Sequence, residues 1–120
     1  MENKRYKLCI LPIFERDLNE IVDYIAFKLK NPDAAKSLVD NVEKAIYKRL
    51  EHPEAFEKFN SLKKRKHSYY RIFVKNYIIF YVVLGDIMEV RRILYSKRNL
   101  DKELWYILKK LNIMWQKALF

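Results

Sequence analysis

Cysteine, glycine and proline are all scarce in this chain of 120 residues. The sequence contains one cysteine, one glycine and three prolines. A single thiol, that of Cys9, cannot form a disulfide within the chain, and this predicts a reducing compartment. So little glycine and proline leaves few positions for irregular backbone. A disulfide-stapled scaffold and a loop-rich or low-complexity protein are therefore excluded.

Long hydrophobic runs are absent as well. The longest, from Tyr77 to Leu84, has eight residues, whereas a membrane-spanning helix needs about 20. The apolar stretch from Leu8 to Phe14 is too short for a signal peptide, and Pro12 interrupts it. We therefore expect a cytoplasmic protein with no membrane partner.

The residues that are present suffice for a hydrophobic core. Hydrophobic residues make up 51% of the chain and aromatic residues 15%. This composition excludes wholesale disorder, and the length suits one compact domain rather than two.

Basic charge is concentrated in the second half of the chain. The net charge is +10, yet residues 1–57 carry ten basic and eleven acidic side chains, while residues 58–85 carry seven basic side chains and no acidic one. The densest run is Lys63, Lys64, Arg65 and Lys66. A neutral half followed by a basic half predicts one face directed at a polyanion or an acidic protein. The alternative for the run itself is a solvated, lysine-rich loop.

The hydrophobic pattern of the first half predicts a strand and two helices. Residues 5–11 alternate as in a short strand, and the apolar period then becomes helical over residues 14–29 and again over residues 35–50. Between the two stripes, Asn31-Pro32 is typical of a helix N-cap followed by the first helical residue. Two consecutive amphipathic helices with a tight joint predict a helical hairpin.

The second half predicts three strands and a last helix. Residues 54–67 form an expected loop, and the strands cover residues 69–74, 77–84 and 87–95. Asn76 and Gly85 supply the residues that tolerate positive φ in the two intervening turns. A final helix starts at Asn99 or Asp101. The order β-α-α-β-β-β-α predicts an α+β fold, an antiparallel β-sheet packed against the N-terminal helical hairpin.

The element order and several local sequences resemble the RelE/ParE superfamily of toxins from type II toxin–antitoxin systems. The resemblance covers about residues 5–104. It rests on Asn31-Pro32-Asp33-Ala34-Ala35, on Tyr70-Arg71 followed by Asn76-Tyr77-Ile78-Ile79-Phe80-Tyr81, and on Arg92-Ile93-Leu94-Tyr95-Ser96-Lys97-Arg98. It implies a RelE/ParE-like toxin domain over residues 1–104, with residues 105–120 as a C-terminal helical extension packed on the same domain.

The superfamily divides by target. RelE-type members are metal-independent ribonucleases that cut messenger RNA on the ribosome, whereas ParE-type members poison DNA gyrase without chemistry of their own. The RelE-type arginine that stabilises the transition state corresponds to Ile78, and the RelE-type tyrosine that handles the proton corresponds to Leu104. The hairpin of 37 residues from Phe14 to Leu50 suits the ParE branch. Many ParE-like sequences, however, have histidine where Tyr95 stands.

The resemblance also implies candidate site residues. If the chain is a ribonuclease, the catalytic candidates are Arg71, Tyr95, Lys97 and Arg98, with the Tyr95 phenol as a proton shuttle. The candidates for binding the target or a nucleic acid are Lys63, Lys64, Arg65, Lys66, Arg71, Arg92, Lys97 and Arg98. The alternative role for the strand arginines is protection of the sheet edge. Antitoxin binding is expected at Leu104, Leu108, Leu111 and Trp115.

No cofactor or metal is expected. The two histidines lack metal-ligand spacing, and the sequence has no glycine-rich phosphate loop or nucleophile elbow. Three functions remain open: a gyrase-directed toxin, a ribosome-dependent messenger RNA endonuclease, and a non-toxic basic module that binds nucleic acid. In the first two cases the resemblance implies an acidic antitoxin that forms a hetero-oligomer with the toxin.

Overall fold

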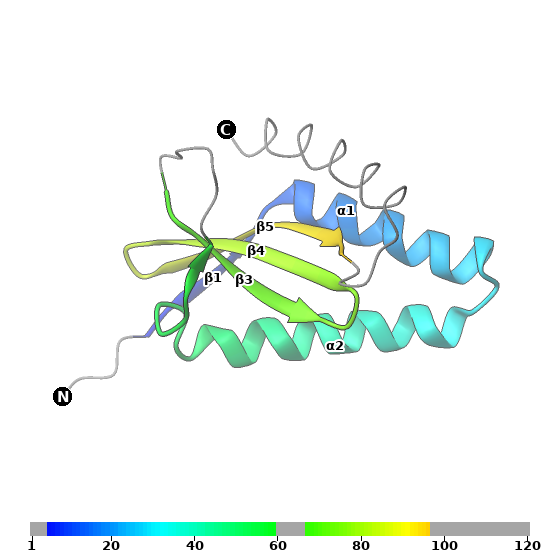
Figure 1. Ribbon diagram of the computed structural model, residues 1–120, viewed down its shortest axis with the longest axis horizontal. Coiled ribbons are helices and arrows are strands. Elements are labelled where there is room, and N and C mark those ends of the chain that lie inside the picture. The colour runs from blue at the N-terminus through cyan, green and yellow to red at the C-terminus, as the bar shows by residue number, and fades with distance from the viewer. Residues whose placement is uncertain (1–4, 60–66, 97–120) are drawn as a thin grey trace.

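The computed structural model describes residues 5–59 and 67–96. Two helices, joined by a π-helical turn, and five strands follow one another along this part of the chain (Figure 1). In order they are β1 (Lys7–Ile10), α1 (Pro12–Asp23), η1 (Tyr24–Lys28), α2 (Pro32–Leu50), β2 (Lys58–Phe59), β3 (Tyr69–Val74), β4 (Tyr77–Leu84) and β5 (Ile87–Tyr95). The predicted α+β class, a helical hairpin on a sheet, is confirmed. The expected last helix and the extension over residues 105–120 lie outside the described residues.

The strands form one sheet in the order β1-β5-β4-β3-β2. Strands β3, β4 and β5 pair antiparallel, as expected, through two-residue turns. Strand β1 instead pairs parallel with β5, so the sheet is mixed rather than wholly antiparallel. Strand β1 lies at the edge of the sheet beside β5, and the two strands run in the same direction. The helical hairpin and strands β2 to β4 connect them along the chain. Alternation in the sequence reveals a strand but not the direction in which it pairs. Strand β2, within the predicted loop, was also missed.

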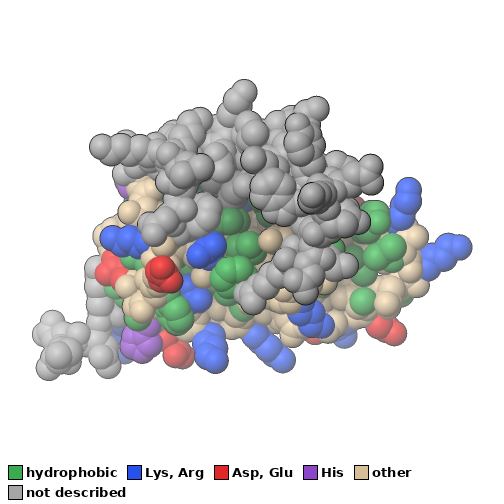
Figure 2. All heavy atoms as spheres, in the orientation of Figure 1, with side chains coloured by type: hydrophobic (Ala, Val, Ile, Leu, Met, Phe, Trp, Pro, Cys, Tyr) green, Lys and Arg blue, Asp and Glu red, His purple; other side chains and the backbone are tan. Residues whose placement is uncertain are grey.

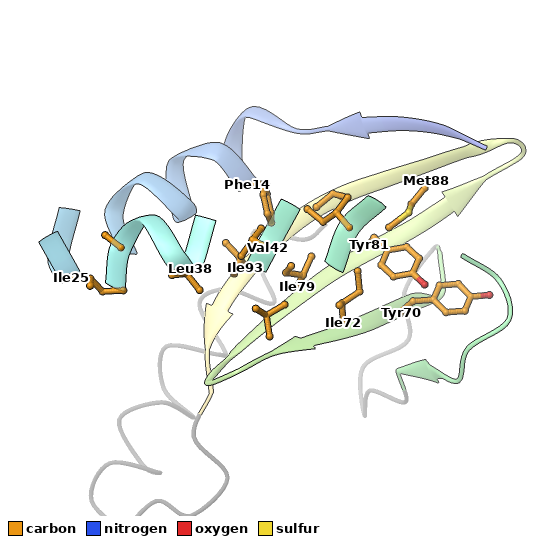
Figure 3. Close-up of a cluster of buried hydrophobic side chains, with 14 residues drawn as sticks. Phe14, Ile25, Leu38, Val42, Tyr70, Ile72, Ile79, Tyr81, Met88 and Ile93 are labelled. Atoms are coloured by element: carbon orange, nitrogen blue, oxygen red, sulfur yellow. The ribbon is translucent and has the colours of Figure 1, made fainter. Parts of the chain in front are cut away.

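The hydrophobic core lies between the helical hairpin and one face of the sheet (Figure 3). Phe14 of α1 and Val42 of α2 are almost fully buried against it. The central strand β4 contributes Ile79 and Tyr81, and β5 contributes Met88, Val90 and Ile93, all at most 1% exposed. Full burial of such a side chain stabilises the fold by about 1.5–3 kcal/mol relative to an exposed one. The apolar residues predicted for residues 77–84 and 35–50 therefore form much of this core.

A buried polar anchor fixes the loop that follows α2. The Tyr81 hydroxyl donates to the carbonyl oxygen of Pro53 at 2.7 Å and accepts from a guanidinium nitrogen of Arg49 at 2.9 Å. That nitrogen also donates to the carbonyl oxygen of Arg71 at 3.0 Å. The Arg49 guanidinium carbon lies 3.5 Å from the centre of the Phe56 ring, a cation–π contact. One buried phenol therefore connects α2, the following loop, β3 and β4.

The connection between the helices contains a π-helical turn that the sequence pattern did not reveal. The amide of Leu29 donates to the carbonyl oxygen of Tyr24 at 3.0 Å, five residues earlier. One additional residue in a turn shifts the phase of the side chains that follow. The predicted stripe that ended with Leu29 was therefore wrong at this residue, which is exposed. Asn31 caps α2 as predicted, since its Oδ1 accepts from the amide of Ala34 at 3.2 Å.

Lys30 ends this turn in the left-handed backbone region, with φ of 52°. The amide of Asn31 donates to the carbonyl oxygen of Ile25 at 3.1 Å, as in a Schellman closure. Glycine normally occupies this position because a Cβ disfavours positive φ. Replacing Lys30 with glycine is therefore expected to raise the free energy of unfolding by about 0.5–1 kcal/mol, measured by urea denaturation.

The matched control is Lys36→Gly, an exposed lysine within α2. That change is expected to lower stability by about 1 kcal/mol, because glycine is a poor residue in a helix interior. Equal effects of the two substitutions would contradict the explanation based on positive φ.

The two sheet turns share one backbone feature. Lys75 and Gly85 each occupy the first turn position and have φ of 52° and 62°. The prediction for Gly85 is confirmed, whereas the prediction that Asn76 carries the positive φ was wrong. Both turn types that suit a two-residue hairpin require positive φ at the first position. Lys75 stands at that position and therefore adopts positive φ although it has a Cβ.

Candidate target-binding face

The sheet has a second face, opposite the helices, on which Arg71, one of the predicted site residues, lies. We define the second face by Tyr69, Arg71 and Phe73 of β3, Ile78, Phe80, Val82 and Leu84 of β4, and Glu89, Arg91 and Leu94 of β5. These residues alternate with the core positions, so they point away from the helices. Its buried centre consists of Tyr69, Phe80 and Val82. The face therefore has an apolar centre with charged groups on either side.

Arg71 lies on the β3 side of this apolar centre. It stands opposite Phe80 in the β3–β4 register and is half-buried. Its guanidinium carbon lies 5.4 Å from the centre of the ring of Phe73, which is exposed. Stacking of this kind holds a guanidinium against an aromatic ring. The predicted Arg71 is thus placed on the second face.

Arg91 lies on the β5 side, and the sequence analysis did not single it out. Its Nε donates to an Oε1 of Glu89 at 2.8 Å, and a terminal nitrogen donates to the Tyr69 hydroxyl at 2.7 Å. Burial alone would lower the pKa of the Arg91 guanidinium, but these two bonds raise it above its usual value. The sequence does contain a pattern that points to this pair: apolar Met88 and Val90 alternate with Glu89 and Arg91. This alternation places Glu89 and Arg91 on the same side of one strand.

Arg92, another candidate for target binding, makes its hydrogen bonds with α1. The β4–β5 register shifts between Phe80 and Tyr81, so Arg91 is the extra residue of a β-bulge, whereas Arg92 stands opposite Phe80 and extends its guanidinium to α1. There its Nε and a terminal nitrogen donate to the two carboxylate oxygens of Asp17 at 2.7 and 2.9 Å. The amide of Ile93 also donates to this carboxylate, at 3.3 Å. Arg92 therefore attaches α1 to the sheet, beyond the end of β1.

Tyr95 and Arg71, both proposed for catalysis, lie on opposite sides of the sheet. Tyr95 stands directly opposite Tyr77, and the two rings meet edge to face with centres 5.6 Å apart. Tyr77 packs against the core on the helix side, so Tyr95 shares that side. Burial, with the neighbouring phenols of Tyr95 and Tyr24, raises the pKa of Tyr77. The structure does not bring the Tyr95 phenol next to the Arg71 cation.

Ile78 is the residue that the resemblance aligns with the RelE-type arginine. It stands opposite Leu94 in the β4–β5 register, and both pack against the buried centre of the second face. The remaining predicted residues lie outside the described part of the chain: Lys63, Lys64, Arg65, Lys66, Lys97, Arg98, Leu104, Leu108, Leu111 and Trp115.

Two further properties concern residues 5–59 and 67–96 only. No three histidine, cysteine, aspartate or glutamate side chains lie close enough together there to hold a metal ion. No helix in that part is both long and apolar enough to cross a membrane.

A helical hairpin on a mixed sheet, with an apolar and cationic second face, defines a toxin fold of the RelE/ParE superfamily. The family described as "ParE toxin of type II toxin-antitoxin system, parDE" matches residues 10–100, which is most of the chain. The chain therefore belongs to the ParE toxin family, and the predicted resemblance is confirmed.

One solved structure adds a likeness of fold. "Chromosomal ParDE TA system from P. aeruginosa" superimposes with a TM-score of 0.66 and 14% sequence identity, covering 78% of this chain and 99% of that chain. "Crystal Structure of RelB-RelE antitoxin-toxin complex from Methanococcus jannaschii" has a TM-score of 0.40 and 23% identity, covering 72% of this chain and 88% of that chain. No curated protein sequence matches.

Proposed function

We propose that this toxin arrests bacterial growth by binding and poisoning DNA gyrase, without chemistry of its own. The observation that supports this proposal most is the apolar centre of the second face, where Ile78 stands in place of the RelE-type arginine. That centre is itself buried, so a partner contacts what surrounds it: Phe73, which is exposed, and the half-buried Ile78, Leu84 and Leu94. Aromatic side chains and arginines are enriched in protein-binding hot spots.

The arrangement of polar groups supports binding over RNA cleavage. Metal-independent cleavage needs a base for the 2′-hydroxyl, a cation for the developing charge and an acid for the leaving oxygen. The Glu89 carboxylate on the second face is paired with Arg91 at 2.8 Å, which leaves it poorly suited as a base. Tyr95 lies on the other side of the sheet. Tyr95 and Arg71 therefore do not act together on one site, whereas Lys97 and Arg98 lie outside the described residues.

We also propose that an acidic antitoxin neutralises the toxin and forms a hetero-oligomer with it. The net charge of +10 favours an acidic partner, since complementary charge accelerates association and selects against basic competitors. One structure of the same fold is described as a ParDE toxin–antitoxin system. The antitoxin site proposed at Leu104, Leu108, Leu111 and Trp115 stays a prediction, as does the extension over residues 105–120.

The experiment that tests the gyrase proposal follows DNA and protein synthesis by pulse-labelling after the toxin is induced alone. DNA labelling is expected to fall first, and purified toxin is expected to accumulate cleavage complexes of purified gyrase on supercoiled plasmid. An earlier fall in protein labelling, with messenger RNA cut on the ribosome, would refute this target and support the endonuclease alternative.

Arg71→Ala is expected to weaken the poisoning of gyrase about tenfold, because truncating an arginine at a hot spot commonly costs 1.4 kcal/mol or more of binding free energy. The matched control is Lys48→Ala, which removes one exposed positive charge from α2 on the other side of the molecule. Equal losses in the two variants would indicate that only net charge matters, and would count against the second face as the interface.

A further inference from the structure

The end of the helical hairpin exposes three large apolar side chains that the proposed second face does not include. We define the hairpin tip by Tyr24, Phe27 and Leu29, together with Lys28 and Lys30. The apolar members are 54%, 76% and 55% exposed, respectively. Apolar groups of this size gathered at one place on a soluble protein generally mark a contact site.

Local backbone structure holds the tip in this arrangement. Tyr24 to Lys28 form the π-helical turn, a feature that is frequent at functional sites. The bond from the Leu29 amide to the Tyr24 carbonyl and the bond from the Asn31 amide to the Ile25 carbonyl close it at 3.0 and 3.1 Å. Because two overlapping bonds already fix the backbone, binding of a partner here costs little conformational entropy.

The tip projects from one end of the molecule. Figure 1 shows the turn between α1 and α2 extending past the end of the sheet, and Figure 2 shows hydrophobic side chains grouped on that end beside basic ones. Tyr24 is close enough to Tyr77 to affect the pKa of its phenol. The tip therefore lies at the end of the sheet that carries the β3–β4 turn (Figure 1), on the helix side, where Tyr77 lies.

We propose that the hairpin tip is an anchor for the target protein, inserting into a concave apolar pocket whose rim carries carboxylates. This inference rests on the proposed function, with gyrase as the partner. The order Phe27-Lys28-Leu29-Lys30 alternates two apolar anchors with two exposed ammonium groups. Apolar anchors between lysines complement a pocket with an acidic rim.

Other occupants fit the tip less well. Binding to DNA scales with the number of phosphates that are neutralised, and residues 23–36 carry three lysines and two aspartates, a net charge of only +1. A second copy of the chain would bring the lysines of two tips together. A short antitoxin segment that folds on binding has no pocket of its own, so it suits a groove or flat face better than a projecting tip.

The test compares three forms of the full chain: the wild type, the double variant Phe27→Ser/Leu29→Ser, and the control Tyr47→Ser, which removes an exposed aromatic side chain from α2 away from the tip. Binding to purified gyrase is measured by surface plasmon resonance, and poisoning by the yield of cleavage complexes. The double variant is expected to bind at least about 30-fold more weakly, whereas the control binds as the wild type does. Thermal unfolding checks that both variants are folded.

Each result decides something. Wild-type binding by the folded double variant would overturn the tip as an anchor while the proposed function stands. A double variant that still poisons gyrase but escapes neutralisation by its antitoxin would reassign the tip to the antitoxin and also overturn the proposal. If the double variant lost binding to a short DNA duplex as strongly as it lost binding to gyrase, the tip would be a nucleic-acid contact. That result would also overturn the proposal. A wild-type chain that does not bind gyrase would refute the proposed function and this inference together.

Discussion

Replacing Asp17 with alanine is expected to lower the free energy of unfolding by about 3 kcal/mol. The carboxylate accepts two bonds from Arg92, at 2.7 and 2.9 Å, and a third from the amide of Ile93 at 3.3 Å. The side chains of this pair are only 12% and 13% exposed. Its removal leaves a guanidinium and a backbone amide without their acceptor in a place that water reaches poorly. Urea denaturation followed by circular dichroism measures the loss.

The double substitution Asp17→Leu/Arg92→Met distinguishes the cost of an unpaired buried charge from the cost of altered packing. Because no unpaired charge is left, the double variant is expected to lose clearly less stability than Asp17→Ala does. Lys7 and Asp86 form an exposed pair at 3.9 Å, so Asp86→Ala is the matched control, with an expected effect below about 1 kcal/mol. A loss from Asp17→Ala no larger than that of Asp86→Ala would contradict the assignment of Arg92 to the fold.

Replacing Tyr81 with phenylalanine is expected to cost about 2 kcal/mol although the ring is kept. The hydroxyl is the buried donor to the Pro53 carbonyl and the buried acceptor for Arg49. Without it, the loop between α2 and β2 loses its attachment, and the amides of residues 51–57 are expected to exchange hydrogen faster. Hydrogen exchange followed by mass spectrometry locates the effect. Tyr47→Phe, at an exposed position, is the control and is expected to be silent.

The same phenol gives the fold a dependence on alkaline pH. Burial raises the pKa of Tyr81, although Arg49 opposes the shift, and burial also raises the pKa of Tyr70 and Tyr77. A raised pKa means that the folded state keeps a proton that the unfolded state releases near pH 10. Stability is therefore complete below this pH and falls as pH rises above it. The fall is expected to be shallower in Tyr81→Phe, and an unchanged slope would contradict this account.

Much of the fold follows from patterns along the sequence. The three strands over residues 69–74, 77–84 and 87–95 were predicted with the bounds that the structure has, because alternation and turn residues agree there. Asn31 was recognised as a cap from its side chain and the proline that follows. Each of these features depends on a few neighbouring residues, which a sequence displays directly.

The features that escaped prediction depend on a partner element or on a single additional residue. The bulge beside Phe80 separates Arg91 from Arg92, and a pattern of alternate residues cannot show where the alternation breaks. The π-helical turn exposes Leu29 in the same way. The parallel direction of β1 depends on the path of the whole hairpin. As a result the bond of Arg91 to Tyr69 and the bonds of Arg92 to Asp17 were not predicted from the sequence.

The parallel pairing of β1 with β5 has a consequence for how the protein is made. Strand β1 leaves the ribosome well before its partner β5, which follows only after the helical hairpin and strands β2 to β4. Closing so long a loop is slow, and contacts between distant segments form late in folding. Until β1 is in place, one edge of β5 presents unpaired backbone groups to other strands. The nascent chain therefore completes its sheet only after β5 has been made.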